Sequence, residues 1–238
     1  MGVRKKNTGF TIIEVVLFLG ITGLLILALM VGVGVSVRRH RYDDSVAAFV
    51  DFLKEQFGKV QNVQNTVATD HPVPGCTGGG TGQSSCVIYG RYIFMDSEGD
   101  GSSGLIRTYL AVGPEVQNIN DMFNNVYAVG GETVELPWGA VARYVFPSGS
   151  GSRLHILIYR SPVTGMISTR IVRNSTGMTA EGSAFKIPVA SGTVDRVDFC
   201  VVSPDSYAGQ RQVRLVSGAS SAAGVTLKSG DDSKECDA

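Results

Sequence analysis

Near its start the chain carries one long apolar stretch. Residues 15–37 contain no charged side chain, and a single carboxylate, Glu14, stands directly before them. At 1.5 Å per residue this stretch would form a helix roughly 35 Å long, enough to cross a bilayer core of about 30 Å. The pattern therefore predicts a helix over residues 10–37 that is sheathed by lipid or by other helices.

Beyond this stretch the apolar residues recur at helical spacing. They are separated by steps of three and four residues, which places them on one face of a helix. We expect the helix to continue to about residue 67, with residues 38–70 as an amphipathic extension. Glycine and β-branched residues at 32–37 disfavour helix and mark its weakest point. The stripe consists of Val46, Phe49, Val50, Leu53, Phe57, Val60 and Val63.

A proline-containing break follows the expected helix. The run His71-Pro72-Val73-Pro74-Gly75 ends it, because proline lacks an amide donor and restricts the residue before it. Short β-type runs come next, each bounded by turn-forming residues, as in antiparallel sheets. They cover residues 87–95, 105–112, 140–146, 154–160, 166–172, 194–202 and 212–216, and a short helical turn is expected at 118–125.

Together these patterns predict an α+β fold. A long N-terminal helix, membrane-spanning in its first half and amphipathic in its second, is expected to pack on a C-terminal antiparallel β-sheet domain, residues 71–238. The roughly 170 residues after the helix suffice for one compact domain with a sizeable core. Basic and acidic residues number 21 each, so no overall positive charge points to nucleic acid.

Two simple interpretations compete for the N-terminus. A secretory signal would have an apolar run of about 7–15 residues with a small-residue cleavage site, whereas this run is longer and ends in the basic residues 38–41. A plain anchor fits the length but leaves Glu14 unexplained, since a charge in hydrocarbon costs roughly 3 kcal/mol. Basic residues flank both ends, so the positive-inside rule does not decide the orientation.

The run Gly9-Phe10-Thr11-Ile12-Ile13-Glu14 offers a role for this carboxylate. Cleavage between Gly9 and Phe10 would create an amine on Phe10, four residues from Glu14. The two opposite charges could then pair within one subunit or between neighbours. Such pairing would align helices in register rather than catalyse a reaction.

The N-terminus GFTIIEVVLFLGITGLL resembles the class III signal peptide and first helix of type IV pilins and type II secretion pseudopilins. The resemblance implies that a membrane aspartyl prepilin peptidase removes the leader, residues 1–9, after Gly9 and methylates the amine of Phe10. It also implies that Glu14 directs subunit assembly. The partners would be other pilins, in a homo- or hetero-polymer, and the pilus or secretion assembly machinery.

The same resemblance implies a structural protein, a pilin or minor pilin of a type IV pilus or related filament. A type II secretion pseudopilin is the alternative. Before assembly the chain would be a single-pass protein in inner-membrane lipid with its C-terminal domain outside. Afterwards it would lie in a cell-surface pilus or a pseudopilus of the cell envelope. No catalytic residue is predicted, because the three histidines lie apart and no nucleophile or phosphate-binding motif accompanies them.

Three acidic residues alternate in one predicted turn. Asp96, Glu98 and Asp100 precede Gly101, a spacing that suits calcium, although the distal glutamate of a complete EF-hand loop is missing. A polar hairpin turn explains the same residues, because Asp and Gly supply turn geometry. The stretch also resembles the aromatic-Asp-x-x-Gly-x-Gly turn of GspH/FimT-like minor pilins. No other cofactor is predicted.

The run from Gly209 to Arg214 resembles, with altered spacing, a Gly-Arg-x-Arg stretch through which some FimT-like proteins bind DNA. Arg211 and Arg214, with Lys228, could neutralise phosphates in a salt-sensitive manner. Solvated charges that protect a sheet edge from aggregation are the alternative. DNA is therefore a candidate partner, and a DNA- or surface-binding minor pilin at a filament tip is an alternative function.

Four cysteines in an exported chain indicate disulfides, for which three connectivities exist. A Cys76–Cys86 bridge would close a loop rich in Gly, Ser and Thr. A Cys200–Cys236 bridge would pin the C-terminal tail to a core strand, although Cys200 could equally be a buried thiol. Zinc is not predicted, because no two cysteines have the short spacing of a zinc site.

Overall fold

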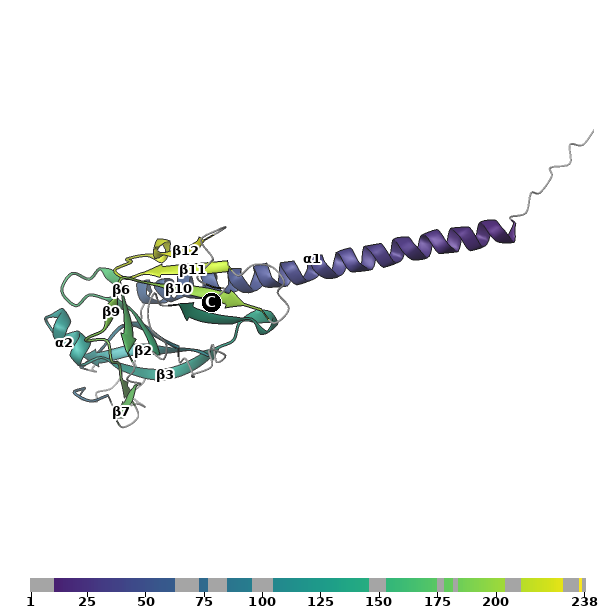
Figure 1. Ribbon diagram of the computed structural model, residues 1–238. Coiled ribbons are helices and arrows are strands. Elements are labelled where there is room, and N and C mark those ends of the chain that lie inside the picture. Colours follow the sequence, from purple (N-terminus) through teal and green to yellow (C-terminus); the bar gives the residue numbers. More distant parts are fainter. Residues whose placement is uncertain are drawn as a thin grey trace, which may run out of the picture. The chain divides into compact units, whose positions relative to one another are not determined.

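The computed structural model describes residues 11–62, 73–76, 85–95, 105–145, 153–174, 178–181, 184–203, 211–228 and 236. They form one long helix, α1 (Ile12–Gln61), a short helix, α2 (Ile119–Asn124), and antiparallel strands (Figure 1). The chain divides into an N-terminal unit, Met1–Arg41, and a globular unit, Tyr42–Ala238. The α+β class is confirmed, and α1 contributes residues to both units.

Helix α1 keeps its helical conformation through residues 32–37, where glycine and β-branched residues made the weakest point expected. It ends at Gln61, and the rest of the expected extension, residues 63–70, lies outside the described residues.

The strands form two sheets in the globular unit. The larger sheet has the order β7-β8-β3-β2-β1-β5-β6-β9, and the smaller has the order β12-β11-β10-β4. Every predicted strand is present with ends shifted by a few residues, but the run predicted at 194–202 is divided between β9 in the larger sheet and β10 in the smaller. Strands β3, β7, β8 and β12 were not predicted. The strands are β1 (Cys86–Met95), β2 (Ile106–Pro114), β3 (Tyr127–Val134), β4 (Val141–Val145), β5 (Arg153–Arg160), β6 (Ile167–Asn174), β7 (Thr179–Glu181), β8 (Ala184–Lys186), β9 (Thr193–Val194), β10 (Arg196–Val202), β11 (Arg211–Val216) and β12 (Val225–Lys228).

The apolar stripe of α1 lies in the main core of the globular unit. This core joins the helix to both sheets, because it also contains residues of β1 and β5 from the larger sheet and of β10 and β11 from the smaller. Phe49 of α1 meets Phe199 of β10 edge-on, with ring centroids 5.1 Å apart. The predicted stripe is thus confirmed at Val46, Phe49, Val50, Leu53, Phe57 and Val60, while Val63 lies outside the described residues.

A second core covers the other face of the larger sheet. Met122 and Phe123 of α2 pack there with aromatic residues of β1 and β2. Asn118 caps α2 by accepting the amide of Asp121 at 2.8 Å. Arg170 of β6 stacks over the Phe123 ring, 4.1 Å from its centroid. The central strands are therefore buried on both faces.

One half-buried arginine joins helix and sheet. Arg91 of β1 donates to the side chain of Gln56 on α1 at 3.2 Å and to Thr108 on β2 at 3.3 Å. Its guanidinium lies 3.7 Å from the Glu132 carboxylate. Burial lowers the pKa of Arg91. The bond to Gln56 ties α1 to β1 at this position, while the contacts with Thr108 and Glu132 stay within the larger sheet.

Candidate functional site

The tip of α1 is closed by a reciprocal pair of side chains. The Thr11 amide and hydroxyl each donate to Oε2 of Glu14 at 3.1 Å, and the Glu14 amide donates to the Thr11 hydroxyl at 3.4 Å. This is a capping box, in which Thr at the N-cap and Glu at the third helical position satisfy free amides. The spacing Thr-x-x-Glu is the sequence signal for this box, although Glu14 was predicted only to pair with an amine.

The capping box changes how Glu14 is interpreted. Its carboxylate already stabilises the helix start, so a structural role stands beside the proposed role in assembly. Both donated bonds use Oε2, and no described residue donates to Oε1. The carboxylate therefore retains capacity for a second, cationic partner. Gly9 and Phe10 lie outside the described residues.

The apolar surface of α1 in the N-terminal unit is open on all sides. Between Ile12 and Val37 its large apolar side chains are each at least 40% exposed within the chain. A continuous apolar surface of this size marks contact with a membrane or with other proteins. Among the described helices, α1 alone is long and apolar enough to cross a membrane.

Several small features of this surface suit close packing of helices. A shallow apolar hollow lies along one side, where Gly34 leaves room beside longer side chains. At Gly20, Gly23 and Gly32 an added Cβ would meet nothing within 4 Å, so another backbone could approach closely. The Thr22 hydroxyl donates to the Phe18 carbonyl at 2.8 Å, which satisfies it without water. The hollow is lined by Ile26, Leu29, Met30, Val33 and Gly34.

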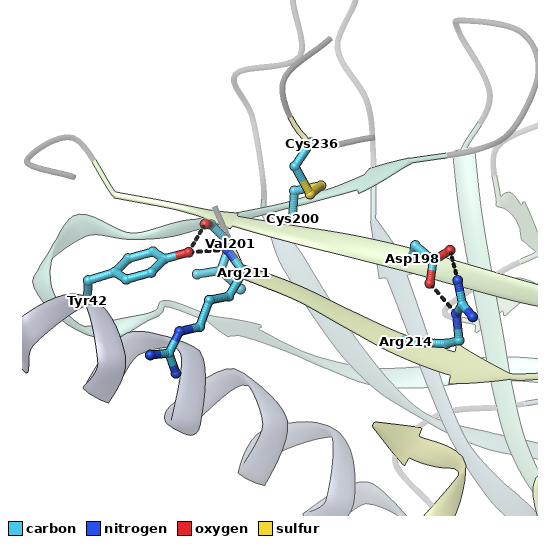
Figure 2. Close-up of a disulfide and its surroundings, with 7 residues drawn as sticks. All are labelled: Tyr42, Asp198, Cys200, Val201, Arg211, Arg214 and Cys236. Carbon is cyan, nitrogen blue, oxygen red and sulfur yellow. Dashed lines mark hydrogen bonds and ion pairs between the residues drawn. A yellow bond between two sulfur atoms is a disulfide. The ribbon is translucent and has the colours of Figure 1, made fainter. Parts of the chain in front are cut away.

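A polar joint fastens α1 where it enters the globular unit. The Tyr42 hydroxyl donates to the Val201 carbonyl at 3.1 Å and accepts the Arg211 amide, so it bridges β10 and β11 (Figure 2). The Arg211 guanidinium reaches Asp43 on α1 at 2.8 Å. Burial raises the pKa of Tyr42. The Tyr42 side chain thus reaches from the helix to the two strands, and the Arg211 side chain reaches from β11 back to the helix.

The candidate DNA-binding residues do not share one surface. Arg211 and Arg214 are three residues apart on β11, so they point to opposite faces of the strand. Arg214 forms two bonds, at 2.6 and 2.9 Å, with the buried carboxylate of Asp198 (Figure 2). Lys228 lies on β12 opposite Gln212. DNA contact by these residues stays a prediction, and internal ion pairs already engage both arginines.

Both predicted disulfides are present. Cys76 is bonded to Cys86, and Cys200 of β10 is bonded to Cys236. Cys200 is therefore not a free thiol. Cys200 and Asp198 are two residues apart on β10, so strand alternation places them on the same face. Two disulfides indicate that the globular unit folds in an oxidising compartment.

The candidate metal ligands Asp96, Glu98 and Asp100 lie outside the described residues. Within the part of the chain that the structure describes, no group of three His, Cys, Asp or Glu side chains is arranged to hold a metal. His155 is fully buried on β5, and its Nδ1 lies 2.6 Å from the Tyr92 hydroxyl. Burial raises the pKa of Tyr92 well above its usual range. This pair lies within the second core, and its buried position indicates a role in packing rather than in catalysis.

Comparison with known proteins gives no assignment. No protein-family model, curated protein or solved structure matches the chain. By shape alone, a long apolar helix continuing into a unit where it packs on antiparallel sheets is a pilin-like architecture.

Proposed function

We propose that this protein is a non-enzymatic structural subunit, a pilin or minor pilin, of a type IV pilus or related filament. The observation that carries the proposal is the exposed, uncharged surface of α1 over residues 15–37, with one carboxylate, Glu14, at its head. Lipid would cover this surface before assembly, and the helices of other subunits would cover it afterwards. The disulfide-bonded globular unit would lie outside the cytoplasmic membrane.

Leader removal is the first step of the proposed pathway. A prepilin peptidase would cut after Gly9 and methylate the new amine on Phe10. This amine, on the same or a neighbouring subunit, would pair with Glu14 in a low-dielectric helix bundle, where an unpaired charge is costly. Sequencing the mature chain from its N-terminus tests this step directly, and any start other than Phe10 overturns it.

The capping box allows a sharp test of Glu14. Glutamine can replace glutamate in a capping box but carries no charge. We expect Glu14→Gln to insert into the membrane and to be absent from filaments sheared from cells. Thr11→Val is the matched control, because it removes the capping hydroxyl and leaves the charge. We expect this variant to assemble.

The reverse outcome would refute the proposed pairing. If Glu14→Gln assembles normally while Thr11→Val does not, the carboxylate serves only to start the helix.

The cell fraction in which the wild-type chain is recovered distinguishes a pilus from a secretion pseudopilus. A pilus subunit appears in the sheared surface fraction, whereas a secretion pseudopilin stays with the cell envelope.

A further inference from the structure

The only tryptophan of the chain occupies an unexpected position. Trp138 is 54% exposed, whereas most large apolar side chains of the globular unit are buried. It follows Pro137 in a tight turn between β3 and β4. Burial in the core therefore does not explain a tryptophan here.

Turn geometry does not explain it either. Trp138 has φ 60° and ψ 24°, Gly139 has φ 68°, and the Ala140 amide donates to the Pro137 carbonyl at 3.3 Å. These values describe the mirror image of a type I turn, whose first central position favours Asn, Asp or Gly. Trp138 is the only non-glycine residue with positive φ among those described. A bulky residue in this conformation is an outlier of the kind that clusters at functional sites.

The turn is held firmly against the helix. The hydroxyl of Ser45, a fully buried residue of α1, donates to the Pro137 carbonyl at 3.0 Å. Ala140, after the turn, belongs to the main core, and Leu136, before it, packs against that core. The backbone that carries the indole is therefore fixed, while the ring itself remains largely exposed.

The turn lies at the end of the globular unit where the chain enters it. Ser45 is one helical turn after Tyr42, the first residue of that unit. In the sequence, the basic residues 38–41 and the uncharged stretch 15–37 come directly before Tyr42. Tryptophan favours the headgroup level of membranes, because its ring is amphipathic, and juxtamembrane cations attract anionic lipids.

We propose that Trp138 is a lipid-interface anchor, which seats this end of the globular unit in the headgroup layer before assembly. The proposal rests on the proposed membrane-anchored function. It also predicts that the globular unit has a preferred orientation on the membrane.

The single tryptophan makes a direct test possible. The full chain is reconstituted into vesicles of phosphatidylcholine and phosphatidylglycerol, with or without bromine on the acyl carbons nearest the headgroups. We expect the emission of Trp138 to shift to the blue in vesicles and to lose intensity when the lipids are brominated.

A matched control moves the indole to the far end of the helix. Val163 is 63% exposed in the turn after β5, and Arg160 at the start of that turn donates to the Gln61 carbonyl at 3.2 Å. Gln61 lies about 24 Å along α1 from Ser45. The double variant Trp138→Asn, Val163→Trp keeps the left-handed turn and should show emission that brominated lipid leaves unchanged.

Flotation of the vesicles separates the two proposals. If the chain floats with the vesicles but Trp138 is quenched by aqueous iodide and not by brominated lipid, the interface anchor is overturned and the membrane helix stands. Equal quenching of Trp138 and of the control indole also overturns the anchor. A chain that does not float overturns both proposals.

Discussion

The buried ion pair between β10 and β11 offers the sharpest test of how the globular unit is stabilised. Asp198 is only 4% exposed, and Arg214 gives it two charge-assisted bonds. Arg214→Met keeps most of the aliphatic stem but leaves the carboxylate without its main partner. Arg196, whose Nε lies 3.8 Å from Asp198, can compensate only in part.

The expected loss follows from this geometry. Removing one partner of a buried pair typically costs about 3–5 kcal/mol, because the remaining charge stays desolvated. The partial compensation by Arg196 places the expected loss near the lower end, about 3 kcal/mol. Replacing both partners, as in Asp198→Leu with Arg214→Met, should restore most of the stability, since no buried charge then remains.

Urea unfolding of the full chain in detergent micelles, followed by circular dichroism, measures these differences. Arg107→Met on β2 is the control, because Arg107 is exposed and surface substitutions usually stay within about 0.5 kcal/mol. An Arg214→Met variant as stable as this control would refute the reasoning. A double variant less stable than Arg214→Met would refute it equally.

Two further predictions concern the disulfides and alkaline pH. Replacing Cys200 and Cys236 by alanine should cost about 4 kcal/mol and replacing Cys76 and Cys86 about 3 kcal/mol, because the bridges join residues 36 and 10 positions apart; a larger loss for the shorter loop in urea unfolding contradicts this. Burial raises the pKa of Tyr92 above its model-peptide value of 10.0, so the folded chain keeps a proton that the unfolded chain releases. Stability should therefore fall as pH rises above 10, and Tyr92→Phe should reduce that slope. An unchanged slope would show that Tyr92 does not contribute, since Tyr42 and Tyr89, whose pKa values burial also raises, would supply the whole effect.

Local sequence patterns were enough to predict the long helix and most of the strands. The stripe of α1 repeats apolar residues at helical spacing, and β1 and β5 are short apolar runs between turn-forming residues, so no tertiary information was needed. Both disulfides were among the predicted possibilities, but only the structure selects them from the three connectivities and excludes a free thiol at Cys200.

Other features depend on partners far away in the chain. Strand β3 contains Gly130 and Gly131, residues that usually mark loops, and its pairing with β2 overrides that preference. Arg91 looks like a surface residue in sequence, and only the assembled fold supplies Gln56 and Thr108 as its partners. Arg211 and Arg214 were grouped as one basic site, although strand alternation alone separates their directions.

The contact between Phe49 and Phe199 can form only after β10 has been synthesised. Helix α1 is synthesised early, while Phe199 of β10 follows Phe49 150 residues later in the sequence. At a synthesis rate of about 5–20 residues per second, the apolar face of the helix waits roughly 8–30 seconds for this strand. A chain that stalls before β10 would therefore cover the apolar face of α1 only with the strands of the larger sheet and β4, and would leave the side that meets Phe199 exposed.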